Sequence, residues 1–165
     1  MTIRPILRYP DARLSQPCHP IETFDAALAS LCDDLLQTMR AAPGVGITAA
    51  HIGELSRISV IHLSADAPVL VHINPQILSA SQERQRHTEG SVSMPGFTEE
   101  VERPLAIRFR YQDLTGHPHE AEADGFLATC VQHEIDQLDG IFWLKRLSRL
   151  KRDRLVRKWE KHSSL

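Results

Sequence analysis

The chain has 165 residues, a formal net charge of −2 at pH 7, 42% hydrophobic residues and 24% charged residues. This composition is that of an ordinary globular protein, and it excludes collagen-like, disordered and coiled-coil structures for the chain as a whole. The length predicts a single domain over residues 1–165, with enough chain to bury a hydrophobic core.

The first predicted helix covers Asp25–Arg40. Its apolar residues recur at three- and four-residue steps, so they share one face of a helix. Those residues are Leu28, Leu31, Leu35, Leu36 and Met39. Pro43 and Gly44 follow, as is typical at the end of a helix. The pattern therefore indicates an amphipathic helix.

Segments rich in β-branched and apolar residues follow, separated by turn residues. They predict strands at Arg57–Leu63, Val69–Ile73, within Gln76–Gln85, and at Leu105–Gln112. Asn74-Pro75 is predicted to end the second strand. Leu105–Gln112 alternates between apolar and polar residues, and Asp113–Pro118 is predicted to be a hairpin turn before a short return strand. Short turns favour antiparallel sheets with helices packed against them, an α+β fold.

A second helix is predicted from about Ala123 to Leu138, ending near Gly140. It carries His133-Glu134, the start of the zinc-hydrolase motif H-E-x-x-H. In that motif two histidines one turn apart bind one metal, and the glutamate deprotonates the metal-bound water. Gln137 occupies the second histidine position here, so this helix by itself favours a buried polar pair.

Two other segments stand out, Gly44–Gly53 and Glu89–Gly96. In the first, two glycines separated by one residue let the backbone approach a ligand closely. It is not a dinucleotide-binding fingerprint, because no strand precedes it within a βαβ unit and its third glycine is misplaced. The second is a short motif, E-G-S-V-S-M-P-G, that ends in turn residues.

Together and in this order, the three segments resemble the peptide deformylase family. That family's motifs are G-x-G-x-A-A-x-Q, E-G-C-x-S and Q-H-E-x-D-H-L-x-G. Further similarity lies in Tyr9-Pro10-Asp11, Thr38-Met39, Ile73-Asn74-Pro75 and Val101–Pro104. The resemblance covers roughly residues 3–147 and implies the fold of this family.

The resemblance implies hydrolytic removal of the N-formyl group from N-formylmethionyl peptides, with a divalent metal, iron or zinc, as cofactor. It makes Glu134 the general acid and base, and it places His51 at the position of the catalytic glutamine. The metal-ligand positions fall on Ser91, His133 and Gln137. The substrate and oxyanion contacts fall on Val45, Gly46, Glu89 and the backbone N–H of Val92.

Three chemical positions depart from the family pattern. Ser91 replaces the cysteine, Gln137 the second histidine, and His51 the glutamine. A neutral hydroxyl and an amide oxygen are weaker ligands than a thiolate and an imidazole. Their substitution removes much of the roughly 10 kcal/mol or more that strong ligand sets provide. We therefore expect little or no metal at the family position and impaired or altered deformylase activity.

His51 leaves several routes open. Its imidazole can act as a substitute metal ligand beside His133, with Glu134 or Glu89 supplying a carboxylate. It can equally donate a hydrogen bond to a bound carbonyl, or pair with Glu134 in a dry cleft. A metal-free route through Ser91 and a histidine would also need an orienting group and an oxyanion hole.

Two functions are consistent with these residues. One is a divergent amidohydrolase acting on formyl or similar acyl peptides, with activity that depends on Glu134. The alternative is a non-catalytic pseudoenzyme that binds a peptide or protein partner in the retained cleft. Elsewhere, Asp136 is predicted to hold a basic residue such as Arg103, Cys130 to pack in the core, and His117 and His119 to lie in a solvated turn.

The charge is unevenly distributed. Lys145–Leu165 has nine basic and two acidic residues, a net charge of +7, whereas the preceding residues carry −9. A basic tail favours contact with a polyanion, although a solvated helix from about Ser148 to residue 165 explains it as well. The family resemblance makes ribosome or RNA contact through this helix a hypothesis.

The sequence contains no stretch of about 18 apolar residues, so no membrane contact is expected. Its first residues carry charges and prolines where a signal peptide needs an apolar stretch. The three cysteines are odd in number and form no C-x-x-C motif, so no disulfide framework is expected. These features predict a cytoplasmic protein.

Overall fold

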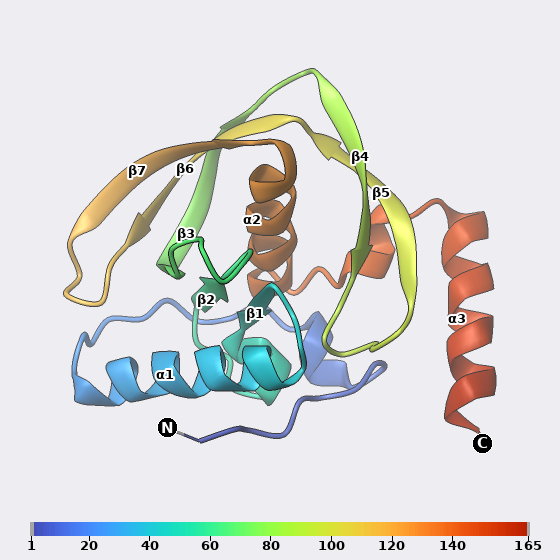
Figure 1. Cartoon of the computed structure of the whole chain (residues 1–165), viewed down its shortest axis with the longest axis horizontal. Coiled ribbons are helices and arrows are strands. Elements are labelled where there is room, and N and C mark those ends of the chain that lie inside the picture. Colours follow the sequence, from blue (N-terminus) through green and yellow to red (C-terminus); the bar gives the residue numbers. More distant parts are fainter. Residues whose placement is uncertain (1, 165) are drawn as a thin grey trace.

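A computed structural model describes residues 2–164 and shows two antiparallel sheets around a central helix (Figure 1). The larger sheet has the strand order β1-β2-β3-β6-β7. Its strands are β1 (Gly46–Thr48), β2 (Ile58–Ile61), β3 (Leu70–Ala80), β6 (Ala106–Gln112) and β7 (Pro118–Asp124). A hairpin forms the second sheet, from β4 (Arg84–Gly90) and β5 (Thr98–Pro104). The α+β prediction is confirmed.

The three helices are α1 (Ala26–Ala41), α2 (Gly125–Leu138) and α3 (Arg149–Ser163). The predicted bounds of α1 are correct to one residue. Its N-cap is Asp25, whose carboxylate accepts a 3.0 Å hydrogen bond from the Leu28 N–H. The predicted start of α3 is confirmed as well, because the Ser148 hydroxyl caps this helix by accepting from the Lys151 N–H. The second helix begins at Gly125 instead of Ala123, since β7 continues to Asp124.

The predicted break at Asn74-Pro75 is wrong, because β3 runs through it to Ala80. Asn74 adopts a positive φ of 52°, and the register against β6 shifts between Ile73 and Gln76. The Asn74 side chain stabilises this irregularity by accepting from the Ile21 N–H and donating to the Ile21 carbonyl, both at 2.8 Å. A β-bulge at Asn74-Pro75 therefore lets the strand continue past the two residues that were predicted to end it.

The alternation predicted for β6 and the hairpin that follows it are confirmed. Ile107 and Phe109 are buried, whereas Arg108 and Arg110 are exposed. The turn closes with a 2.9 Å hydrogen bond from the Gly116 N–H to the Asp113 carbonyl. All three cysteines are buried free thiols. Within residues 2–164, no helix has the length and apolar character needed to span a membrane.

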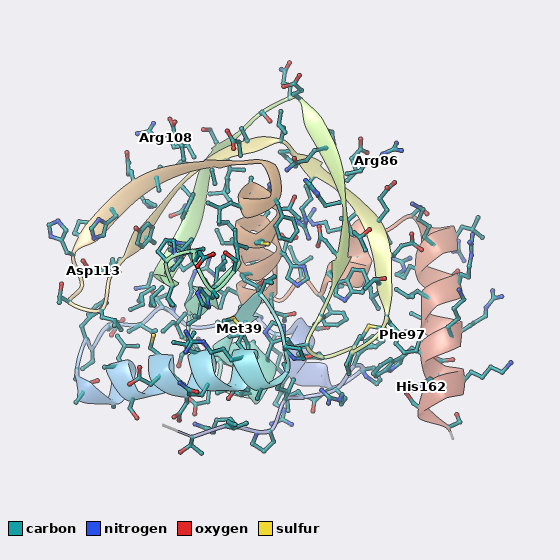
Figure 2. All side chains as sticks on the ribbon, in the orientation of Figure 1. Met39, Arg86, Phe97, Arg108, Asp113 and His162 are labelled. Atoms are coloured by element: carbon teal, nitrogen blue, oxygen red, sulfur yellow. The ribbon has the colours of Figure 1, made fainter. Side chains whose placement is uncertain are left out.

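Helix α2 lies between the larger sheet and the β4–β5 hairpin, and α3 lies outside that hairpin (Figure 1). Ala128, Val131 and Ile135 of α2 pack into the core of the larger sheet. On the other side, Trp159 of α3 packs edge-on against Phe97, with ring centroids 5.1 Å apart. Figure 2 shows Phe97 beside His162, at the contact between the hairpin loop and α3. This arrangement buries nearly every residue of α2, including its polar ones.

Candidate functional site

The three segments singled out in the sequence meet around a cavity of about 410 Å³. Ala42–Gly46 and His51 contribute one wall, and α2 contributes another. The third wall comes from Thr88–Val92 and Met94–Thr98 of the hairpin. The α2 residues that line it are Phe126, Thr129, Cys130, His133 and Glu134. Eight of the nine site residues expected from the sequence line this cavity; Gln137 does not.

His133 is held by a carboxylate on the neighbouring hairpin. Its Nδ1 donates a 2.8 Å hydrogen bond to Oε1 of Glu89, and both side chains are buried. Burial disfavours the charged imidazole, but the carboxylates of Glu134 and Glu89 outweigh it and raise the pKa of His133. Because Nδ1 is engaged, Nε2 is the ring nitrogen available to the cavity.

Glu89 belongs to a chain of buried ion pairs. Arg103 donates to both its carboxylate oxygens, at 2.6 and 2.9 Å, and also donates to Asp136 at 2.8 Å. Arg146 then holds Asp136 with two hydrogen bonds of 2.8 and 2.7 Å. Burial would raise the pKa of Glu89, but hydrogen bonds from His133 and Arg103 lower it to about 2. The predicted Asp136–Arg103 pair is confirmed.

Glu134 is buried in the cavity wall, 4% exposed. Its Oε2 lies against the backbone of Gly46, where a Cβ would come within 2.5 Å of this oxygen. Glycine at position 46 is thus required by the close approach of the carboxylate. Burial raises the pKa of Glu134 to about 7, while the positive charge of His133 opposes the rise.

His51 lies in the 3₁₀ turn Ala49–Ile52, directly after β1. Its Nδ1 accepts a 2.9 Å hydrogen bond from the Thr48 N–H and lies 3.1 Å from the Thr48 hydroxyl. The ring is 1% exposed, and burial together with the nearby His133 lowers the pKa of His51 to about 3. His51 is therefore a neutral imidazole at physiological pH.

The other lining residues come from two loops. The Ser91 hydroxyl accepts a 3.0 Å hydrogen bond from the Ser93 N–H. Val92 contacts the backbone of Gly44 so closely that a Cβ there would lie 2.8 Å from its Cγ1. Val45 is 41% exposed at the rim. Among residues 2–164, no hydrogen bond links Ser91 to an imidazole, so the pairing that activates a serine nucleophile is not formed.

Gln137 lies outside the cavity. It is 2% exposed, and its amide nitrogen donates a 2.7 Å hydrogen bond to the Leu14 carbonyl, which belongs to the 3₁₀ turn Ala12–Ser15. Gln137 therefore connects α2 to the N-terminal segment of the chain.

The comparisons with known proteins agree with this geometry. The model of the polypeptide deformylase family matches residues 3–153. A protein of Agrobacterium fabrum described as peptide deformylase-like is 63% identical over 161 residues, 98% of each chain. A peptide deformylase crystal structure from Legionella pneumophila superposes with a TM-score of 0.92 at 38% identity, covering 99% of this chain and 96% of that one.

A second crystal structure, of peptide deformylase from Ehrlichia chaffeensis in complex with actinonin, also gives a TM-score of 0.92. It is 36% identical and covers 98% of each chain. These matches define a protein of the deformylase fold, and the chain belongs to the peptide deformylase family.

The family is metal-dependent, but the residues of this chain do not fit its metal. The Gln137 amide nitrogen donates to the Leu14 carbonyl. The Ser91 hydroxyl, an uncharged metal ligand, accepts a hydrogen bond within its own loop. Glu89, the candidate replacement carboxylate, is held by Arg103 and His133. In the part of the chain that the structure describes, no three His, Cys, Asp or Glu side chains are grouped so that they could hold a metal ion.

Sequence reasoning missed part of the site. The sequence pattern groups Arg146 with the basic tail, yet Arg146 closes the ion-pair chain at Asp136. The wall formed by Phe126 and Cys130 had a usable signal, since both lie on the same helical face as His133. Burial raises the pKa of Cys130 to about 12, so its thiol remains protonated and packs as an apolar group.

Proposed function

We propose that this protein binds the N-terminal end of an N-formylmethionyl or related peptide in the cavity, and that its metal-dependent deformylation is impaired. Family membership supports the class of ligand, and the open, largely apolar cavity supports a peptide end as its occupant. The protein is expected to act in the cytoplasm, with residues 1–165 forming one domain.

The orientation of the Gln137 side chain is the observation that supports the proposal of impaired activity. Its hydrogen bond to Leu14 leaves the His133 imidazole as the one strong ligand type among the three family ligand positions. A metal supplies the activated nucleophile in hydrolysis of this kind. What the remaining residues offer is a carboxyl–imidazole pair that can hold or move a proton, and a neutral imidazole donor.

The test compares the wild type with a variant in which the family residues are restored, H51Q/S91C/Q137H. Hydrolysis of formyl-Met-Ala-Ser is measured anaerobically with iron, zinc, nickel and cobalt, and the peptide's affinity is measured by calorimetry. We expect the wild type to bind the peptide, but to release formate at least about a hundredfold more slowly than the restored variant.

Metal-dependent turnover by the wild type at the rate of the restored variant, abolished by Glu134→Gln, would overturn the impaired activity. It would favour the other candidate, an amidohydrolase with a metal site rebuilt around His51 and His133. Failure of the folded wild type to bind formyl-Met-Ala-Ser would overturn the ligand class.

A second proposal concerns the ribosome or other RNA as a partner. Four exposed basic residues at i, i+3, i+4 and i+7 of α3 form a stripe facing away from the buried Leu155 and Trp159: Arg154, Arg157, Lys158 and Lys161. Because Leu155 and Trp159 anchor α3, charge reversal of the stripe is a better test than deletion of the helix.

We expect reversal of the stripe to abolish salt-sensitive co-sedimentation with ribosomes. The matched control reverses four exposed arginines elsewhere: Arg40, Arg86, Arg108 and Arg110. Equal loss in the control, or retention in the stripe variant, would contradict the proposal.

A further inference from the structure

The hairpin wall of the cavity is also in contact with α3, the helix that lies outside the hairpin (Figure 1). Residues 91–97 connect β4 to β5, and all of them except Ser93 line the cavity. Two of these residues, Met94 and Phe97, pack in the hydrophobic cluster that contains Trp159 of α3. The same loop therefore contacts the cavity on one side and the C-terminal helix on the other.

Phe97 is the loop residue that α3 contacts through aromatic rings. Its ring centroid lies 5.1 Å from that of Trp159, with an interplanar angle of 85°, and 5.3 Å from that of His162 (Figure 2). Such edge-on contacts are directional, so they restrict the position of the Phe97 ring as well as covering it. Trp159 is buried whereas His162 is exposed, so Trp159 is the firmer support of the two.

Trp159 is itself held by the N-terminal segment of the chain. Its Nε1–H donates a 3.0 Å hydrogen bond to the carbonyl of Tyr9, whose ring stacks on Phe142. The Tyr9 N–H in turn donates a 3.1 Å hydrogen bond to the Ser93 carbonyl. The loop is thus supported at Ser93 and at Phe97 by groups that lie outside the cavity.

The loop needs this support because part of its backbone is free to move. Pro95 and Gly96 are exposed, and Gly96 adopts a positive φ of 84° that glycine reaches without strain. Glycine also gives the loop more backbone conformations to lose when it is ordered. A ligand that binds one loop conformation has its apparent affinity reduced by the fraction of molecules in the others.

Resting on the proposed function, we infer that Trp159 is a positioning residue for peptide binding. It does not line the cavity, yet it holds Phe97 in the cavity wall. Helix α3 is then a part of the peptide site, in addition to carrying a charged surface. Trp159 and His162 lie beyond residue 153, where the match to the family model ends, so family membership does not predict this contact.

The first experiment measures the affinity of the full chain for formyl-Met-Ala-Ser by calorimetry. We expect Trp159→Ala to weaken binding by about 5- to 50-fold, because fewer molecules keep the loop in place. Trp159→Phe restores a ring against Phe97 and should bind within about threefold of the wild type. The control is Leu28→Ala, a buried α1 residue that does not line the cavity, which should change affinity by less than about twofold.

Melting temperatures show that each variant is folded at the temperature of the binding measurement. If Trp159→Ala does not fold, Trp159→Leu takes its place, since leucine fills more of the space but supplies no ring. An affinity loss that is the same in the control, or that Trp159→Phe does not rescue, would overturn the inference.

The second experiment asks whether the effect of Trp159 passes through Phe97. Phe97→Ala weakens peptide binding directly, because Phe97 lines the cavity. In that background we expect Trp159→Ala to change the affinity by less than about twofold, since the ring that it positions is gone. Residues that act through one contact are non-additive in this way. A full additive loss in the double variant would overturn the inference.

The third experiment observes the loop without any peptide. The amides of Met94 and Phe97 close two turns of the loop, onto the carbonyls of Ser91 and Met94 at 3.0 and 3.2 Å. We expect their hydrogen exchange to be at least about tenfold faster in Trp159→Ala, but not in Leu28→Ala. Unchanged exchange would overturn the inference and leave the proposed peptide binding intact, whereas a wild type that binds no formyl-Met-Ala-Ser would overturn both.

Discussion

Two clusters of buried polar side chains meet at α2, and they differ in how completely they are paired. In the first, Glu89, Arg103 and Asp136 are joined by hydrogen bonds of 2.6 to 2.9 Å. In the second, His51 and Glu134 each keep one unpaired atom, as far as residues 2–164 are concerned. His133 belongs to both, since Glu89 holds one side of its ring and the other faces the cavity.

This difference separates a fully paired structural network from a cluster with atoms that can still take a hydrogen-bond partner. A fully paired cluster fixes the geometry of its members and adds nothing for a ligand to satisfy. An unpaired donor and acceptor in a cavity wall are costly to the folded protein and favourable to a ligand. The unpaired cluster is therefore the one whose atoms a ligand could still satisfy under the proposed function.

The largest expected effect comes from breaking the paired cluster at its centre. Arg103→Met leaves Glu89 and Asp136 without their shared partner, and we expect a loss of about 3–5 kcal/mol in the free energy of unfolding. Urea unfolding measures it. The control is Arg108→Met, an exposed arginine on β6, which should cost at most about 1 kcal/mol. A loss as small as the control's would show that the chain of ion pairs is not a structural unit.

His72 is a buried imidazole for which burial alone lowers the pKa, so the pH dependence of stability tests what an unpaired buried group costs. The His72 ring packs against Phe109 and Tyr111, with centroids 5.1 and 4.5 Å away, and burial lowers its pKa to about 4. The unfolded chain binds this proton at about pH 6.5, so stability falls as the pH decreases from 6.5 toward 4.

We expect His72→Phe to remove about 2–3 kcal/mol of the stability loss between pH 7 and pH 4.5. Unfolding midpoints at the two pH values measure this, with the exposed His117→Phe as control. An unchanged difference between the two midpoints in His72→Phe would mean that other groups, such as His51, dominate the acid sensitivity.

The unpaired cluster can be disturbed from its backbone side. Gly46→Ala places a methyl group 2.5 Å from Oε2 of Glu134, so the carboxylate has to move. Such overpacking costs about 1–3 kcal/mol, and peptide affinity should fall with it. In a Glu134→Ala background the same glycine change should cost much less stability. An equal cost in both backgrounds would show that the glycine is needed for another contact.

The sequence predicted the fold and the meeting of the three motif segments because both follow from local patterns. Apolar spacing located α1, and motif order indicated the family. The sequence did not reveal where the Gln137 side chain points. Helical spacing places Gln137 beside His133, but the carbonyl of Leu14, far away in the sequence, determines its orientation. Likewise the tautomer of His51 depends on a three-residue turn that spacing alone does not define. The strand end predicted at Asn74 is wrong because the bulge that carries β3 past it depends on a hydrogen bond from Ile21.

The smallest expected effect tests whether burial or pairing gives the paired cluster its strength. Arg146 binds the same carboxylate as Arg103 with equally short hydrogen bonds, yet its side chain is 45% exposed against 4% for Arg103. Water can replace the guanidinium of Arg146 at Asp136, so Arg146→Met should cost only about 0.5–1 kcal/mol in urea unfolding. A cost equal to that of Arg103→Met would mean that the four charged groups act as one cooperative unit, in which the exposed end matters as much as the buried centre.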